Sequence, residues 1–176
     1  VRNRTHIYGI PGQPPERERE VGRANQLVAR TCTLLATAVG AGAQFILENP
    51  VDHGDLGNAY SFLNADHAPI WMLHEIQMLQ AVADARKIDF PMCMLGHASQ
   101  KLTTLMVTPK LYESLSSLEE LQCNHKTHRP AGGEAVDGKW TSSRAAQYPP
   151  ELNKILADAI ARNVDTSAAY RTTCAD

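Results

Sequence analysis

The chain has 176 residues, with 17 lysines and arginines against 19 aspartates and glutamates, so its net charge is −2 with neutral histidines. This length suits one domain with a sizeable core, and the near-neutral charge excludes a global basic footprint for nucleic acid but not a local basic patch. No apolar run reaches membrane-spanning length and no signal peptide is visible, while four scattered cysteines are too few for a disulfide scaffold, so we expect an intracellular protein with no membrane segment.

Composition divides the chain into an arm, a domain and a tail. The start is dense in proline and glycine and carries Arg2, Arg4 and His6. Such a start is either a solvated loop or a loop that contacts phosphate. The expected segments are a basic loop arm at residues 1–17, a single α/β domain at 18–162 with an irregular insert at 122–142, and a loose tail at 163–176.

A helix followed by a short buried strand begins the domain. Apolar residues at helical spacing predict a helix over 18–39, which Gly40 ends. The run Phe45–Leu47 is apolar throughout, which is typical of a strand covered on both faces, so we expect an interior strand over 44–48 that Pro50 stops. Helix, glycine turn and buried strand together make an αβ unit of a parallel sheet.

The later elements complete an α/β pattern. The sequence predicts a helix over 69–85, then strands over 87–94 and 100–108 that form an antiparallel hairpin. A short helical stretch follows Pro109, and a last helix is expected over 151–162. The predicted fold class is therefore α/β, with a Rossmann-like, partly parallel sheet flanked by helices and carrying an antiparallel hairpin.

Two polar residues end the predicted buried strand. Glu48 and Asn49 would be delivered to the carboxyl edge of the sheet, where open α/β folds bind their ligands. The alternative is a strand end with two solvated polar residues, because short motifs often match by chance.

A separate cluster predicts a metal site. Cys123, His125 and His128 place three potential ligands within six residues, and the hairpin brings Cys93 close enough to be the fourth. Structural zinc takes such cysteine and histidine mixtures in a tetrahedron. The alternative is that the cysteines are small buried apolar residues and the histidines belong to an ordinary surface loop.

The order of these pieces resembles the second half of the cytosine-5 DNA methyltransferases, especially short, divergent versions in phage and mobile-element polyproteins. In that family a helix leads into a strand ending in Glu-Asn-Val, followed by a helix, a strand with a Tyr-Gly turn, a Gln-x-Arg-x-Arg strand and, after a variable segment, a proline-led helix. The resemblance covers roughly residues 20 to 162. The matching stretches here are Phe45–Pro50, Phe90–Gly96, Gln100–Thr103 and Ser143–Leu152.

The resemblance implies DNA as a partner and S-adenosylmethionine as the methyl donor. It also implies catalytic roles for Glu48, Asn49, Gln100 and Lys101 around a cleft that receives a flipped cytosine. A thiolate attacks carbon 6 of that base, and a carboxyl group at Glu48 would hold ring nitrogen 3 and stabilise the developing charge. Lys101 would contact a phosphate or the loop that carries the nucleophile.

The sequence also departs from the family. Cys32 lacks the preceding proline of the nucleophile motif, Gly40 and Gly42 follow a helix instead of a strand, and Lys101 and Thr103 stand where the family has arginines. We therefore expect the isolated chain to be inactive and to depend on an upstream domain or a partner chain. The alternative function is a non-catalytic, zinc-stabilised interaction or nucleic-acid-binding module of a viral or mobile-element polyprotein.

Overall fold

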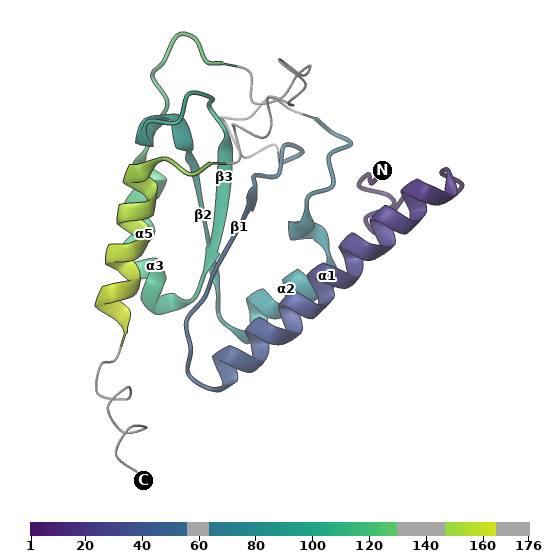
Figure 1. The fold of residues 1–176 in the computed structure, drawn as a ribbon, viewed down its shortest axis with the longest axis horizontal. Coiled ribbons are helices and arrows are strands. Elements are labelled where there is room, and N and C mark those ends of the chain that lie inside the picture. Colours follow the sequence, from purple (N-terminus) through teal and green to yellow (C-terminus); the bar gives the residue numbers. More distant parts are fainter. Residues whose placement is uncertain (56–63, 130–146, 165–176) are drawn as a thin grey trace.

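Residues 1–55, 64–129 and 147–164 are described by a computed structural model of the chain. A three-stranded antiparallel sheet lies between two layers of helices (Figure 1). The strand order is β1-β3-β2, so the last of these three strands in the sequence lies in the middle. The strands are β1 (Ile46–Pro50), β2 (Arg86–Pro91) and β3 (Leu102–Val107).

Each face of the sheet carries its own pair of helices. The helices α1 and α2 cover one face, where Met106 of β3 packs with Trp71 and Ile76. The helices α3 and α5 cover the other face, where Phe90 and Leu105 pack with residues of both helices. The bounds are α1 (Pro15–Gly40), α2 (His74–Val82), α3 (Pro109–Leu115) and α5 (Pro150–Asn163), with short 3-10 helices at Ile70–Met72, Met92–Leu95 and Ser116–Glu120.

The mixed α/β class and the β2–β3 hairpin are confirmed, but the expected parallel pairing is absent from the described residues. β1 and β2 run in the same direction, and β3 separates them because the hairpin folds it back antiparallel to both. All six residues of β3 are buried, as a central strand requires. The interior position expected for β1 is therefore wrong within this sheet, since β1 pairs with β3 alone.

Two predicted elements are shorter than their patterns indicated. The strand that begins near Lys87 ends at Pro91, because Met92–Leu95 turns as a 3-10 helix and Gly96 adopts a φ of 92° that favours glycine. This turn takes Cys93 out of the strand and towards the loops above the sheet. The helix predicted over 69–85 divides into a 3-10 turn and the shorter α2.

The N-terminal arm is tied to the domain by side-chain contacts. The guanidinium of Arg4 donates to both carboxylate oxygens of Asp52 at 2.7 Å. The hydroxyl of Tyr8 donates to Glu75 of α2 at 2.8 Å. A Cβ at Gly54 would meet the Arg4 guanidinium, so a larger residue there would require the Arg4 side chain to move. Within the described segments, no helix is both long and apolar enough to cross a membrane.

Candidate functional site

Four potential metal ligands converge beyond the carboxyl end of β2. Cys93 lies in the 3-10 turn after β2, and Cys123, His125 and His128 come from the segment that follows the 3-10 helix Ser116–Glu120. Their ligand atoms all lie within 4.8 Å of one another. The sulfur of Cys123 is 3.4 Å from that of Cys93, and it lies 3.6 Å from His125 Nδ1 and 3.2 Å from His128 Nε2. The four residues that the sequence grouped are thus brought together, and the group could hold a metal ion.

The distances suit a tetrahedral centre. With zinc bonds of about 2.3 Å to sulfur and about 2.0 Å to nitrogen, two sulfurs would stand about 3.8 Å apart, and sulfur and nitrogen about 3.6 Å apart. The three separations measured from the Cys123 sulfur, 3.2–3.6 Å, differ from these by less than half an ångström, and the other pairs of ligand atoms lie within 4.8 Å. Cys93 and Cys123 are free thiols, so no disulfide competes for the sulfur atoms.

The environment of Cys93 disfavours an uncompensated thiolate. Burial, and then the hydrogen bond and charge of the neighbouring Cys123 sulfur, raise the pKa of the Cys93 thiol to about 11. Metal ligation needs the deprotonated thiol and supplies the compensating positive charge. The cluster therefore has the donor atoms of a metal site and lacks the charge that a metal would bring.

The cluster borders the turn that connects β2 to β3. The main-chain N–H of Cys93 donates to the carbonyl of Gln100 at 3.4 Å, across the turn. The N–H of Arg129, next to His128, donates to the carbonyl of Ala98 at 3.2 Å. The ligand-bearing segment is thus hydrogen-bonded to the same turn that carries Cys93.

Glu48 meets two other polar side chains at the sheet face that carries α5. The hydroxyl of Tyr148, just before α5, donates to Glu48 Oε2 at 2.8 Å. The amine of Lys101 lies 5.2 Å from the centre of the Tyr148 ring. Glu48 Oε1 is buried and has no hydrogen-bond partner among the described residues. An acceptor that lacks its donor at this position points to a ligand N–H or O–H.

The Tyr148 hydroxyl is a fixed donor. Burial, followed by the hydrogen bond to Glu48 and the charge of that carboxylate, raises the pKa of Tyr148 well above its usual value. The phenol therefore keeps its proton at neutral pH and holds one oxygen of Glu48. The other oxygen has no donor among the described residues.

The other two predicted site residues lie differently. Asn49 is opposite Thr104 in the β1–β3 register, and successive side chains of a strand point to opposite faces, so Asn49 faces away from Glu48. Gln100 is part of the turn and binds Cys93 through its main-chain carbonyl. The structure thus brings Glu48 and Lys101 together through Tyr148, and it separates Asn49 from them.

Tyr148 is a residue of the Glu48 group that the sequence motifs do not indicate. Its contact with Glu48 spans 100 positions, so no local pattern indicates it. The sequence signal that could have indicated Tyr148 is the pair Pro149-Pro150, because two prolines mark the start of a helix. These prolines begin α5, and Tyr148 lies immediately before them.

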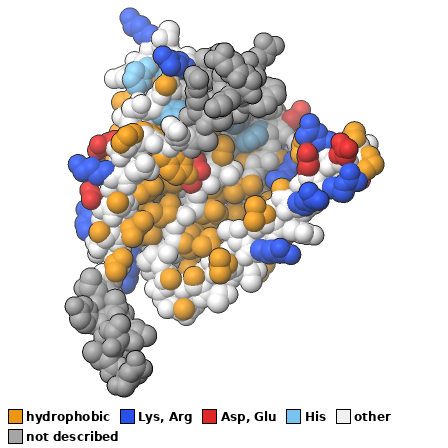
Figure 2. Space-filling view, viewed as in Figure 1, with side chains coloured by type: hydrophobic (Ala, Val, Ile, Leu, Met, Phe, Trp, Pro, Cys, Tyr) orange, Lys and Arg blue, Asp and Glu red, His pale blue; other side chains and the backbone are white. Residues whose placement is uncertain are grey.

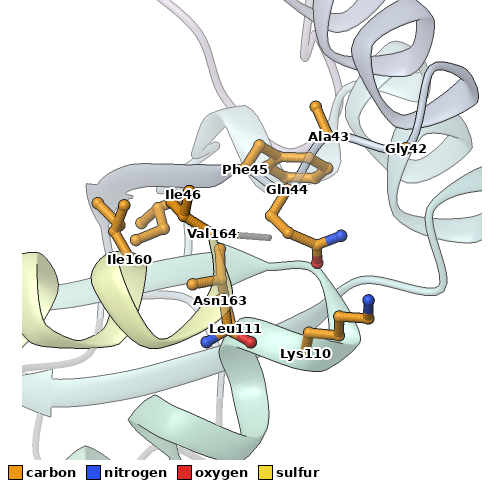
Figure 3. Close-up of a pocket in the computed structure, with 10 residues that line it drawn as sticks. All are labelled: Gly42, Ala43, Gln44, Phe45, Ile46, Lys110, Leu111, Ile160, Asn163 and Val164. Carbon is orange, nitrogen blue, oxygen red and sulfur yellow. The ribbon is translucent and has the colours of Figure 1, made fainter. Parts of the chain in front are cut away.

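A separate cavity of about 660 Å³ lies at the opposite end of β1. Figure 3 shows the side chains of Gln44 and Lys110 on one side of it and those of Ile46 and Ile160 on the other. The Gln44 amide oxygen accepts a hydrogen bond from Thr108 at 2.6 Å, so this group is already satisfied. The cavity shares no residue with the Glu48 group or the metal-ligand cluster.

Comparisons of the chain with protein-family models, with curated proteins and with solved structures found no match. The function is therefore argued from the geometry of the two residue groups and from the motif order in the sequence.

Replacing Tyr148 with phenylalanine isolates the contribution of its hydroxyl, because the ring beside Lys101 is kept. We expect Tyr148→Phe to lower the free energy of unfolding by about 1 kcal/mol, since the contact is a charge-assisted but exposed hydrogen bond. Urea denaturation followed by tryptophan fluorescence measures the change. Tyr112→Phe, which removes a hydroxyl from a longer 3.2 Å contact with Glu119, is the control and should cost less.

Proposed function

We propose that the chain is a DNA cytosine-5 methyltransferase-like domain that binds DNA and receives a cytosine at Glu48. The observation that carries this proposal is the state of the Glu48 carboxylate. One oxygen is held by Tyr148, and the other is buried with no partner among the described residues. Cytosine offers donors on its amino group and, when protonated, on ring nitrogen 3, and these would satisfy the free oxygen.

The order of elements supports the same proposal. A long helix leads into the strand that holds Glu48, and a second helix, a strand, a turn and the strand after Lys101 follow in sequence. This is the order of the family motifs that the sequence resembles. The proline-led α5 then returns to the sheet with Tyr148 immediately before it.

Each residue of the group has a distinct part in binding. Glu48 accepts hydrogen bonds from the flipped base, and Tyr148 fixes the orientation of that carboxylate. Lys101 supplies the positive charge for a neighbouring phosphate, a contact that positions the DNA without reading its sequence. Asn49 points to the opposite face of the sheet, so it would contact DNA or cofactor only through a segment from outside this chain.

S-adenosylmethionine does not fit the described residues. Gly40 ends α1 and Gly42, with a φ of 86°, follows in the turn, so this pair ends a helix and forms no glycine-rich loop after a strand. When bound, the donor would supply the methyl group. The proposal for this chain is therefore confined to binding DNA and holding the base.

A partner segment is proposed at the free edge of β1. The N–H of Thr108 donates to the carbonyl of Phe45, so by strand alternation the backbone groups of Ile46 and Glu48 point away from β3. No other described strand pairs with that edge. Figure 2 shows hydrophobic side chains gathered between α1 and α5 on the face where β1 lies. An upstream domain or a partner chain that adds a strand there would cover the edge.

Substitution of Glu48 tests DNA binding. We expect Glu48→Gln to weaken binding of a duplex with an unpaired cytosine by about 1–2 kcal/mol, or about five- to thirtyfold, because an amide is a poorer acceptor for the base. Fluorescence anisotropy with a labelled duplex measures the affinity. The same duplex with an abasic site in place of the cytosine offers the carboxylate no base donor, so it should bind wild type and variant alike.

The matched control is Asp89→Asn, which makes the same chemical change on β2. Asp89 accepts a hydrogen bond from Thr104, on the side of the sheet away from Glu48. Its substitution should leave the affinity for cytosine-containing DNA unchanged. Equal affinities for Glu48→Gln and wild type, with no preference for cytosine, would rule out the proposed role of Glu48.

A zinc-stabilised binding module is the second candidate function. The observation that favours it is the convergence of two cysteines and two histidines, the ligand types of structural zinc, with their ligand atoms within 4.8 Å of one another. All four positions would be filled by protein, which is the arrangement of structural and not catalytic zinc. Zinc at this cluster is compatible with DNA binding at Glu48, because the two groups share no residue.

A further inference from the structure

One turn connects β2 to β3. Cys93 of the metal-ligand cluster lies near its beginning, and Lys101 lies at its end. The N–H of Met92 donates to the carbonyl of Lys101 at 3.2 Å, and Cys93 is the next residue after Met92. The position of Cys93 is thus coupled through one backbone hydrogen bond to the backbone of Lys101.

Lys101 has a backbone conformation that its neighbours must hold. Its φ is 34°, in the left-handed region that residues with a Cβ adopt at a cost. Such a residue keeps this conformation only where the surrounding structure fixes it. The amine of this residue lies 5.2 Å from the centre of the Tyr148 ring, and the Tyr148 hydroxyl donates to Glu48.

We propose that a metal ion bound by Cys93, Cys123, His125 and His128 fixes the turn that carries Lys101, so that metal loading sets the DNA affinity of the Glu48 site. This inference depends on the proposed function, because it assigns a regulator to the same site. The four metal ligands position the turn and do not contact DNA, whereas Lys101 contacts the DNA phosphate.

The coupling follows from how the two segments are joined. The Arg129 to Ala98 hydrogen bond connects the ligand-bearing segment to the turn. A metal would add a second and stronger cross-link, from Cys93 to three ligands of that segment. With both ends of the turn fixed, the Lys101 amine is held where it makes its phosphate contact, and without the metal that contact is lost.

The first test compares metal-loaded and metal-free protein, both as the full chain. DNA affinity is measured by anisotropy over a series of salt concentrations, after chelation and again after zinc is restored. We expect chelation to weaken binding reversibly and to reduce the slope of log affinity against log salt by about one, the signature of one lost phosphate contact. A metal-free protein with unchanged affinity and slope would overturn the inference.

The second test asks whether the metal acts through Lys101. Lys101→Ala should reduce the salt slope by about one in the metal-loaded protein while leaving zinc content unchanged. Chelation of Lys101→Ala should then cause no further loss, because the contact is already absent. A second loss equal to that of wild type would show that the metal acts by another route. Lys101→Arg, which keeps the charge, should restore most of the slope.

A third test, the effect of DNA on zinc affinity, works even if the metal-free protein does not remain folded. If zinc tightens DNA binding by some factor, DNA must tighten zinc binding by the same factor. Competition with a chromogenic chelator, with and without DNA, measures this effect, which Lys101→Ala should abolish. DNA that leaves zinc affinity unchanged in the wild type would overturn the inference. Metal-loaded protein that fails to bind DNA at all would instead overturn the proposed function.

Discussion

Removing zinc from the cluster of Cys93, Cys123, His125 and His128 should destabilise the domain by about 4 kcal/mol, when the free metal had been about a thousandfold above its dissociation constant. For a chain of this length, that loss corresponds to a fall in melting temperature of about 8–16 °C. The physical reason is that the metal binds only the folded arrangement, in which residues 30 positions apart meet. Thermal denaturation followed by circular dichroism, with and without chelator, measures it.

Cysteine variants identify the site. Cys123→Ser should abolish zinc binding, remove the effect of the chelator and eliminate the absorption bands that tetrahedral thiolate coordination gives when cobalt replaces zinc. Cys32→Ala is the matched control, because Cys32 is buried in α1 and is not part of the cluster. It should bind one equivalent of metal like the wild type. A wild type that melts at the same temperature with and without zinc would contradict the prediction.

The cysteine–histidine cluster was predictable because its signal is mostly local. Three of the four ligands lie within six residues, and the chemistry that makes them ligands does not depend on the fold. The role of Cys93 could be predicted because a hairpin brings the turn after its first strand close to the segments around it. The structure adds what spacing alone does not give, namely that Cys93 lies in a 3-10 turn and is hydrogen-bonded to Gln100.

The relative direction of the strands in the sheet was not predictable from the strand sequences. The run Phe45–Leu47 is apolar because Phe45 and Leu47 pack towards α1 and α2, while Ile46 packs towards α3 and α5. That pattern identifies a strand covered on both faces, but it says nothing about the direction of the neighbouring strand. Insertion of β3 between β1 and β2 is a non-local event that only the packed sheet decides.

The apolar positions of the first helix also cover more of its surface than the face that is buried. Leu27 and Leu34 are apolar residues within the predicted helix over 18–39, yet their exposed fractions are 67% and 69%. They lie on a helix whose buried residues are Val21 and Cys32. Exposed leucines on α1, together with the free edge of β1, are the features that a partner segment would cover.

The composition of the Glu48 site was only partly predictable. Strand alternation alone places Glu48 and Asn49 on opposite faces, so two adjacent residues of one motif cannot both line one cleft on a regular strand. Lys101 was placed near the site by motif order, but its φ of 34° has no sequence signal, because lysine does not favour that region. Tyr148 enters from the far end of the chain.

The isolated chain should transfer no methyl group to DNA, even where it binds DNA at Glu48. Methyl transfer to carbon 5 of cytosine needs a thiolate that attacks carbon 6 and a bound donor. Burial, and then the charge of Glu75, raise the pKa of the Cys32 thiol, and this residue lies within α1. The described cysteines that remain, Cys93 and Cys123, belong to the metal-ligand cluster, where a metal would hold their thiolates.

An assay with labelled S-adenosylmethionine and cytosine-containing DNA gives the result. We expect counts at background for the wild type and for Glu48→Gln, beside a complete cytosine-5 methyltransferase that labels the same DNA. The same preparation should bind DNA in the anisotropy measurement, which separates absence of chemistry from absence of folding. Turnover by the 176 residues that Glu48→Gln abolishes would mean that both a nucleophile and a donor site exist in this chain, and that the described thiols have been assigned to the wrong roles.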